Sequence, residues 1–305
     1  MKTKFHQPVL LKESLAFLEI KKGKSYIDAT VGGGGHACQI VKKGGRLLGI
    51  DRDPQAVKFA RKQLTKTCLA VPQPGDGSQY SWKVVQGNFA HLKEIARKND
   101  FAKVSGILFD LGVSSFQLNN ANRGFSFLKE GPLDMRMDPR LKVKAADLLN
   151  ALSQKELTKL FSKLGEEKKA RTIARAVVKF RQQKKFTNTK QLAKLIQAIY
   201  HNQRKIRRIH PATKAFQALR IAVNDELINL EKGLQDAREL LKKDGRLVII
   251  SFQALEDRIV KQFFKEQKKL NQLAIITKKP LVPTAKEANH NPRSRSAKLR
   301  AAVKI

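Results

Sequence analysis

The chain has 305 residues, of which 41% are hydrophobic and 29% are charged, which is typical of a globular protein with a sizeable core. No apolar run approaches the roughly 18 residues that span a membrane, and the N-terminus lacks the apolar core of a signal peptide. The two cysteines, Cys38 and Cys68, are too few for a disulfide framework or a zinc cluster. We therefore expect a soluble, cytoplasmic protein with no metal site.

Net positive charge is the strongest global signal. Lys and Arg number 62 against 26 Asp and Glu, so the formal net charge is +36. Such an excess of positive charges is mutually repulsive, and it is expected in a protein whose partner is a polyanion. A lysine-rich proteome would supply part of this charge without any function, but we favour nucleic acid as the partner.

The first elements in chain order surround a glycine-rich turn. A helical pattern at 11–17 is followed by a buried strand at 26–30, which leads into four consecutive glycines. A chain carries such a run where its backbone turns sharply or where a ligand lies against it. The next strand, 46–51, ends in Asp51, nineteen positions beyond Gly32. Because an acid about 20 residues after such a turn binds a ribose hydroxyl in nucleotide-binding βαβ units, we expect a cofactor that contains adenosine.

Strands and helices continue to alternate up to residue 111. Apolar strands are predicted at 82–86 and 104–111, and the second is apolar on both faces, as a central parallel strand should be. This alternation favours a doubly wound α/β sheet. The other elements predicted here are a helix from residue 54 to about residue 64, a loop at 72–81 and a short helix after residue 87.

The alternation breaks between residues 113 and 212. No apolar strand is predicted there, and a loop rich in Gly, Pro, Asn and Asp precedes helical patterns at 170–180 and 189–200. The segment carries 23 Lys and Arg against 7 Asp and Glu, a difference of +16. We interpret 113–212 as a basic helical domain for substrate recognition, inserted into a discontinuous α/β domain of 1–112 and 213–305.

The α/β pattern returns after the insertion. Its predicted elements are one long helix at about 211–241, a turn and strand at 243–252, an amphipathic helix at 256–268, strands at 273–277 and 297–303, and an ordered loop or an arm at 280–295.

Asp110 is the leading candidate for chemistry. It lies at the end of the fourth strand, and ligands of open α/β sheets bind beyond the carboxyl ends of the strands. The alternative is that Asp110 caps the next turn through Ser114 or Ser115, but its position favours a functional role. Among the histidines we single out His36, because it closes the glycine turn.

Residues 122–138 have two interpretations. Aromatic rings alternate there with Arg, Asn and acids, a composition that suits the stacking of bases and the recognition of their edges. Equally, Phe125, Phe127 and Met135 would belong to the core and the loop would only buttress it. The sequence does not decide between the two.

Two later stretches are also candidates. Residues 251–258 would form a second wall of the site, although Glu256 or Asp257 would alternatively serve only the start of a helix. The basic residues of 291–300 suit contacts with phosphates.

Taken together, these stretches resemble one family, the bacterial small-subunit ribosomal RNA methyltransferase H family (16S rRNA cytosine-N4 methyltransferases of the MraW type). The family uses S-adenosylmethionine (SAM) to methylate N4 of a cytidine in the decoding region. The resembling stretches occur in family order and span almost the whole chain. They are residues 6–13, 26–36, 49–55, 110–115, 123–127, 131–139, 210–213, 216–224, 250–252, 255–260 and 291–295.

The resemblance implies a class I SAM-dependent methyltransferase fold, Rossmann-like with a seven-stranded mixed sheet, and an inserted basic helical domain. It implies 16S rRNA within the small ribosomal subunit as the partner, and it leaves the oligomeric state open, a homodimer included. Asp110 becomes the candidate catalytic residue, hydrogen-bonding either the reacting amine or the ammonium of SAM. The implied SAM-binding residues are Gly34, Gly35, His36, Asp51, Phe89, Asp110 and Gln117.

The chain departs from the family pattern in three places. Gln253 and Ala254 stand where a His and a Ser are expected, Phe116 stands where Pro or His is usual, and residues 68–80 are longer. The first departure weakens any proposal that a histidine acts in chemistry there. None removes the cofactor motifs.

Three other functions compete with this interpretation. A nicotinamide-dependent oxidoreductase could use the glycine turn and Asp51, but it would not need the large positive charge. A non-catalytic RNA-binding factor for ribosome assembly would explain the charge but not residues 34–36 together with Asp51. A DNA cytosine-N4 methyltransferase would share the fold and the chemistry and differ in its substrate.

Overall fold

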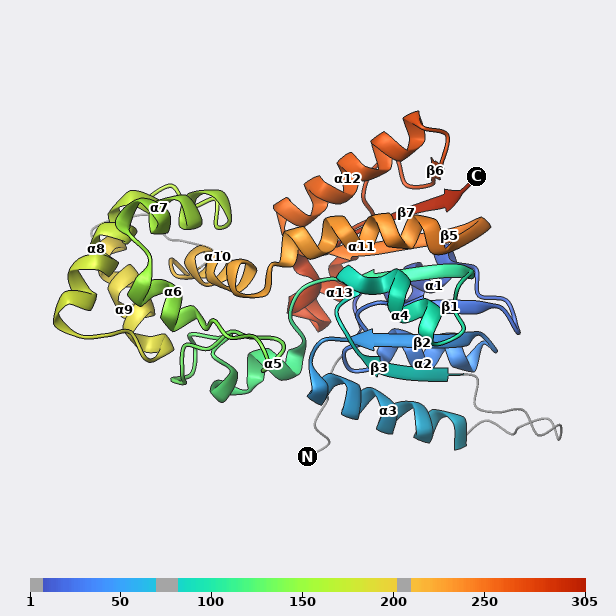
Figure 1. The fold of residues 1–305 in the computed structure, drawn as a ribbon, viewed down its shortest axis with the longest axis horizontal. Helices are drawn as coiled ribbons and strands as arrows, with labels where there is room; N and C mark the ends of the chain where they lie inside the picture. The colour runs from blue at the N-terminus through green and yellow to red at the C-terminus, as the bar shows by residue number, and fades with distance from the viewer. Residues whose placement is uncertain (1–7, 70–81, 202–209) are drawn as a thin grey trace. The chain divides into compact units, whose positions relative to one another are not determined.

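The computed structural model describes residues 8–69, 82–201 and 210–305. The chain divides into two compact units, Met1–Ser114 with Leu227–Ile305 (unit 1) and Ser115–Glu226 (unit 2) (Figure 1). The predicted loop at 72–81 lies outside the described residues. Among those described, no helix combines the length and the apolar character needed to cross a membrane.

Unit 1 is built on a seven-stranded mixed sheet with the order β3-β2-β1-β4-β5-β7-β6, in which only the pairings of β7 are antiparallel. The predicted Rossmann-like, seven-stranded mixed sheet is confirmed. Its elements are α1 (Leu11–Leu18), β1 (Ser25–Asp28), α2 (Gly35–Lys42), β2 (Arg46–Asp51), α3 (Pro54–Leu69), β3 (Trp82–Gln86), η1 (Phe89–His91), α4 (Leu92–Lys98), β4 (Val104–Asp110), α11 (Glu226–Leu240), β5 (Leu241–Ser251), α12 (Ala254–Lys269), β6 (Leu273–Ile275), α13 (Ala285–His290), η3 (Pro292–Ser296) and β7 (Lys298–Lys304).

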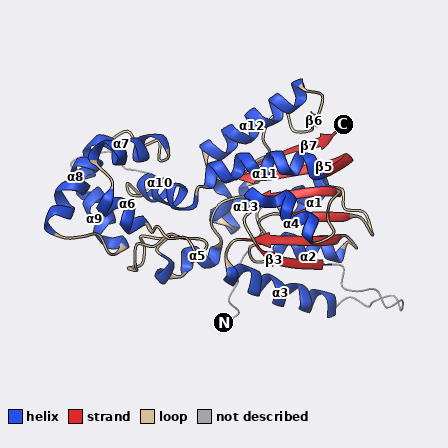
Figure 2. Ribbon diagram, in the orientation of Figure 1, coloured by secondary structure: helices blue, strands red, loops and turns tan. Residues whose placement is uncertain are grey.

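Helices cover both faces of this sheet (Figures 1 and 2). Successive residues of β4 are buried on opposite sides, since Ile107 and Phe109 pack with α4, α11 and α12 while Leu108 packs with α1, α2 and α3. A strand buried on both faces needs apolar residues at consecutive positions. This explains why the central strands were recognisable as continuous apolar runs.

Unit 2 is helical, and loops make up much of its remainder (Figure 2). Helix α7 packs against α8 and α10, and α8 also packs against α9. Side-chain caps begin two of these helices: Ser153 accepts from the N–H of Glu156, and Asn188 accepts from that of Gln191. The elements of unit 2 are α5 (Ser115–Asn119), η2 (Ala121–Arg123), α6 (Ala145–Ala151), α7 (Gln154–Lys163), α8 (Ala170–Gln183), α9 (Thr189–Tyr200) and α10 (Thr213–Asn224).

The prediction of one long helix over 211–241 was wrong. The chain forms α10 and α11, and Asp225 between them adopts a left-handed conformation with φ 49°. The Asn224 side chain explains the break: its oxygen accepts from the N–H of Met137, and its amide donates to the carbonyl of Met135, both at 2.8 Å. Unit 2 therefore extends through α10 to Glu226, beyond the boundary at 212 expected from the sequence.

The segment 280–295, expected to be an ordered loop or an arm, contains helical turns. It contains α13, whose N-cap Thr284 accepts from the N–H of Glu287, and most of η3. The Glu287 carboxylate also accepts from the N–H of Leu10 at 2.8 Å. This segment is thus tied to the start of the described chain.

Candidate functional site

Three aspartates lie at the C-terminal ends of the parallel strands of the unit 1 sheet, which we call the carboxyl edge. Asp28 ends β1 and pairs in register with Gly49 of β2 and Leu108 of β4. Asp51 and Asp110 each stand two residues beyond those partners, so they flank the chain that leaves β1. The strand order therefore gathers three carboxylates where open α/β sheets bind their ligands.

The glycine turn is fixed to Asp51 by backbone hydrogen bonds. The Asp51 carboxylate accepts from the N–H of Gly32 and from the N–H of Asp53, both at 2.9 Å. Gly34 has φ 79°, a left-handed conformation that a residue with a Cβ adopts only with strain. The glycine turn and Asp51 are therefore joined directly by a hydrogen bond.

Gly35 and His36 begin α2 beneath this turn. A Cβ on Gly35 would lie 2.9 Å from Cγ of Pro8, so only glycine fits there without a shift. The His36 ring is 4% exposed; its Nε2 lies 3.2 Å from the carbonyl oxygen of Val9, and its Nδ1 lies 3.7 Å from Oδ2 of Asp110. The structure therefore brings His36 and Asp110 together.

Burial shifts all three carboxylates toward their neutral forms. It raises the pKa of Asp28 to about 7 and that of Asp51 to about 6, although backbone hydrogen bonds oppose both shifts. Burial, reinforced by the carboxylates of Asp28 and Glu256, raises the pKa of Asp110 well above its usual range. Clustered buried carboxylates repel one another when ionised, and a cation among them would relieve that repulsion.

Asp28 and Thr30 are site residues that the sequence analysis missed. Asp28 is 2% exposed and accepts from the N–H of Thr30 at 3.2 Å. The Thr30 hydroxyl in turn accepts from the N–H of Asp110 at 2.6 Å. A signal was present, because an acid inside an otherwise apolar strand calls for an explanation.

Phe89 lies on η1, directly after β3. Its ring meets that of Phe109 edge to face, with centroids 5.5 Å apart, and the guanidinium of Arg52 lies 5.9 Å from its centroid. A Cβ on Gly233 would come within 2.8 Å of the Phe89 ring, so close packing holds the ring from that side as well. Phe89 is only partly buried, which leaves ring surface for a ligand.

Residues 251–258 were predicted to form a second wall of the site, and both acids of this stretch have structural roles. Glu256 accepts from the N–H groups of Phe252 and Gln253 and caps α12. Asp257 binds Arg300, with Nε to Oδ1 at 2.7 Å, and Lys298 at 3.2 Å. Arg300 is thus buried in a pair, and the suggestion that it belongs to a phosphate-binding arm was wrong for this residue.

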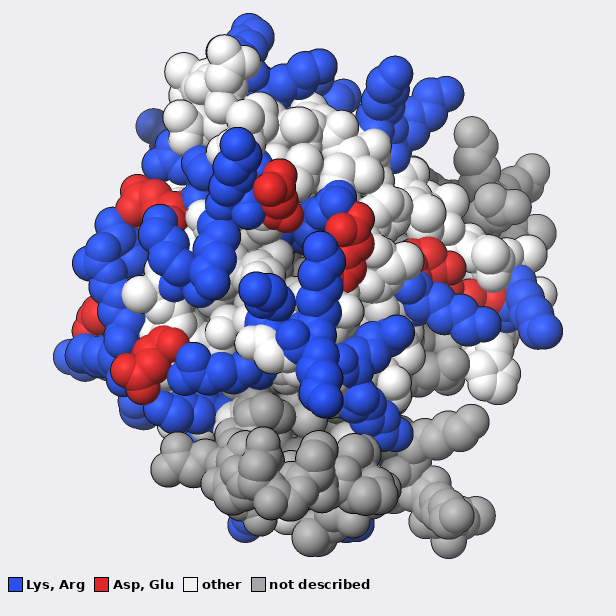
Figure 3. Space-filling model, turned by 90° about the vertical axis from the view of Figure 1, so that its right-hand side faces the viewer, with Lys and Arg blue, Asp and Glu red and all other residues white. Residues whose placement is uncertain are grey.

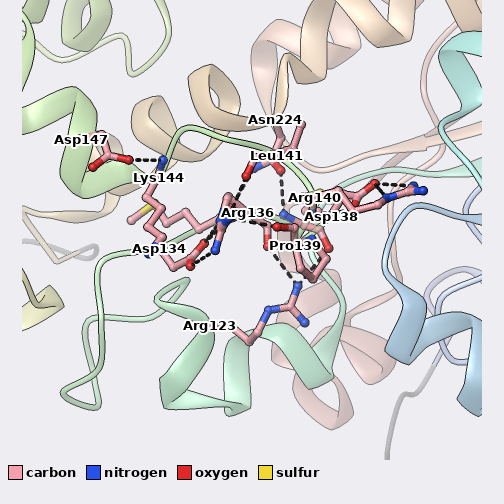
Figure 4. Close-up of polar contacts among 12 residues, drawn as sticks. Arg123, Asp134, Arg136, Asp138, Pro139, Arg140, Leu141, Lys144, Asp147 and Asn224 are labelled. Atoms are coloured by element: carbon pink, nitrogen blue, oxygen red, sulfur yellow. Dashed lines mark hydrogen bonds and ion pairs between the residues drawn. The ribbon is translucent and has the colours of Figure 1, made fainter.

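The loop at 122–138 forms an internally bonded scaffold within unit 2 (Figure 4). Arg123 donates to the carbonyls of Arg136 and Met137 at 3.0 Å, and Arg136 forms a two-pronged ion pair with Asp134 at 2.8 Å. Phe125 and Met135 are buried, whereas Phe127 is half-buried and stacks on His210. For Phe125 and Met135 the buttressing interpretation is therefore the correct one.

Gln117 belongs to unit 2. It lies on α5 and is 4% exposed. Its part in a site with the unit 1 residues stays a prediction.

Comparison with known proteins places the chain in a family. The model of the MraW methylase family matches residues 3–305. The chain belongs to this family. It is 45% identical to the ribosomal RNA small subunit methyltransferase H of Carboxydothermus hydrogenoformans over 317 residues, covering 98% of both chains. It is also 45% identical to the protein of that name from Persephonella marina, covering 98% of this chain and 99% of the relative.

Membership of the family agrees with the architecture of unit 1. The sheet is the class I methyltransferase sheet expected from the resemblance, with β7 inserted antiparallel between β5 and β6. The strand pairing accounts for the position of the cluster, because the turn after β1 and the ends of β2 and β4 all lie at one end of the parallel strands.

Proposed function

We propose that the protein transfers a methyl group from SAM to N4 of a cytidine in 16S rRNA, in the decoding region of the small ribosomal subunit. The family supports rRNA methylation, and the relatives are named for the small subunit. The choice of cytidine N4 and of the decoding region rests on the motif resemblance. One structural observation supports the proposal most: Asp28, Asp51 and Asp110 converge on a glycine turn within a strongly cationic protein.

The residues at this edge fit SAM in charge and in shape. SAM carries a sulfonium and an ammonium, and their positive charge would favour the ionised forms of Asp28, Asp51 and Asp110, which burial alone disfavours. Asp51 keeps acceptor capacity for ribose hydroxyls, because each of its oxygens receives one backbone N–H. Gly34 holds the turn in its left-handed conformation, Gly35 lets Pro8 pack against the start of α2, His36 closes the turn, and Phe89 offers a ring face to the adenine.

The protein has little acid–base work to do in this reaction. SAM supplies a methyl group on an excellent leaving group, and the transfer to N4 releases one proton from that nitrogen. The chain must align the amine with the methyl group and accept hydrogen bonds from the amine. Asp110 is our candidate for that acceptor, because the positive charge of bound SAM would favour its ionised form, which accepts hydrogen bonds and can take up the released proton.

Unit 2 is our candidate for RNA recognition. The described helices α8 and α9 carry exposed basic residues, among them Arg171, Arg175 and Lys194. A cytidine must leave its stack before its N4 can reach a methyl donor, so the enzyme needs a surface that holds the flanking RNA. The excess of +16 over 113–212 suits that task.

The test compares methyl acceptors. Purified protein would be incubated with labelled SAM and small subunits, free rRNA or DNA, and the products would be digested for nucleoside mass spectrometry. We expect N4-methylcytidine from small subunits. Exclusive formation of 5-methylcytidine would refute the proposed chemistry, preferential labelling of DNA would favour a DNA methyltransferase, and absence of SAM binding would favour a non-catalytic assembly factor.

A further inference from the structure

A concavity lies at the opposite end of the unit 1 strands, where β1, β4 and β5 begin. It is a cavity of about 210 Å³ formed largely by two turns, 21–24 and 242–246. Its lining combines five basic residues with two acidic ones. The charged residues are Lys21, Lys24, Lys242, Lys243 and Arg246, with Glu19 and Asp244.

The backbone projects the lysines of this pocket toward solvent. In the ladder between β4 and β5, Leu241 pairs with Val104 and Arg246 with Gly106, so residues 242–245 form a bulge outside the pairing. Asp244 turns this bulge with φ 63°. Lys242 and Lys243 are consequently exposed, as are Lys21 and Lys24 on the neighbouring turn.

The charge of the pocket is largely uncompensated. Of its five basic residues, only Arg246 forms an ion pair within the described part of the chain, with Glu19. Even there, Nε of Arg246 has no hydrogen-bond partner among the described residues. Lys and Arg also crowd the surrounding surface, with few acids between them (Figure 3). Like charges so close together repel, and a polyanion would relieve that repulsion.

We propose that this pocket binds phosphate groups of the RNA backbone. It would be a second contact for the substrate, and the inference rests on the proposed function. RNA is the fitting occupant because the pocket and the surface around it are basic over an area wider than one small anion would need. The seven residues of β4 separate the two edges of the sheet by about 20 Å. A single ligand that contacts both ends of the strands must therefore be larger than a mononucleotide, which suits an RNA substrate.

A charge-removing double variant tests the pocket. Lys24→Ala with Lys243→Ala removes two exposed cations, and Lys261→Ala with Lys265→Ala removes two exposed cations of α12 that do not line the pocket. Binding of each protein to small subunits would be measured between 50 and 200 mM salt, on the order of the range in which phosphate contacts respond. KM for small subunits, kcat and SAM affinity would be measured in parallel.

We expect the pocket variant to bind small subunits about fivefold to tenfold more weakly at 100 mM salt, with a slope of log K against log salt that is shallower by about 1.5. Its KM should rise while kcat and SAM affinity stay unchanged. The α12 variant should change by less than about twofold. Equal losses in both variants, or no loss in the pocket variant, would overturn the inference.

Failure of the proposed function can be distinguished from failure of the pocket proposal. If the wild-type protein methylates no small-subunit RNA, the proposed function fails. The binding titration would still decide whether the pocket holds RNA, because it does not depend on turnover.

Discussion

His36 and Asp110 face each other at the C-terminal ends of the parallel strands. Nδ1 of His36 lies 3.7 Å from Oδ2 of Asp110, and Nε2 of the same ring lies 3.2 Å from the carbonyl oxygen of Val9. Because that carbonyl can only accept, Nε2 carries a proton, and a neutral ring then presents a lone pair at Nδ1. Without a cationic ligand, the raised pKa of Asp110 favours a protonated carboxyl opposite that lone pair.

Asp110→Asn should therefore separate folding from catalysis. The amide is neutral and can donate to Nδ1 of His36, so we expect no fall in Tm at pH 8. Methyl transfer should fall about 100-fold or more, because an amide oxygen is a weaker acceptor for the amine and cannot take its proton. Tm, SAM affinity and single-turnover rate would be measured.

The same variant resolves the role left open for Asp110. Unchanged SAM affinity with a lost rate would assign the carboxylate to the reacting amine, whereas a large loss of SAM affinity would assign it to the ammonium of the cofactor. Full activity would remove Asp110 from the catalytic machinery.

Asp28→Asn should stabilise the protein in a pH-dependent way. The folded pKa of about 7 lies above the ordinary value of 3.8, so the folded state binds this proton more tightly than the unfolded chain. The contribution of Asp28 to the free energy of unfolding therefore decreases as pH rises from 4 to 7. The amide keeps the oxygen that accepts from Thr30 and removes the buried charge.

We expect Tm of Asp28→Asn to exceed that of the wild type by about 3–6 °C at pH 8, and the difference to vanish near pH 4. SAM affinity should decrease, since one of the three carboxylates is lost. A thermal scan at four pH values measures the trend. A variant that is less stable than the wild type at pH 8 would show that the Asp28 charge is well solvated.

Short-range patterns made the arrangement of the glycine turn and its neighbouring acids predictable. The glycine turn and Asp51 are separated by a single βα unit, and their spacing is set by the dimensions of that unit. Asp110 was found because it ends an apolar strand. Asp28 was missed although it is more deeply buried, since its strand was interpreted for its apolar residues alone.

Features that depend on distant partners could not be predicted. Both sides of Asp225 have helical sequence, and the break follows from hydrogen bonds between Asn224 and a loop nearly 90 positions earlier. Arg300 was interpreted as part of a basic arm because nothing near it in sequence identifies Asp257 as its partner. Such pairings become visible only once the sheet has formed.

Gly34→Ala and Gly23→Ala form a matched pair of glycine variants. Both positions have left-handed backbones, with φ 79° and 73°, and neither added Cβ would clash. Each variant should lose about 1 kcal/mol of stability from backbone strain. Gly34 lies in the turn held by Asp51, so only Gly34→Ala should weaken SAM binding, by several-fold in calorimetric titration. Equal SAM affinity in the two variants would contradict the placement of the cofactor at this turn.

The buried pair of Arg300 and Asp257 should contribute strongly to stability. Arg300 is 7% exposed and binds both oxygens of Asp257, at 2.7 and 3.3 Å, whereas the Lys298 side chain is 40% exposed. Burial alone would raise the pKa of Asp257, but the hydrogen bond and charge of Arg300, with help from Lys298, lower it instead. The carboxylate is therefore ionised in the folded protein at neutral pH.

Arg300→Met would leave that carboxylate buried without its main partner. We expect a loss of about 3 kcal/mol or more, against less than about 1 kcal/mol for Lys298→Met. Because the folded pKa of Asp257 is lowered, the stabilisation is present above the unfolded value near 4 and is lost as pH falls through the folded value. The difference between Arg300→Met and wild type should thus persist from pH 8 to 5 and shrink below pH 4. Denaturant unfolding at these pH values provides the measurement.

RNA affinity of Arg300→Met, measured well below the unfolding transition, should not change, because a guanidinium buried against Asp257 is not available to bind phosphate. A specific loss of RNA binding would return Arg300 to the basic arm.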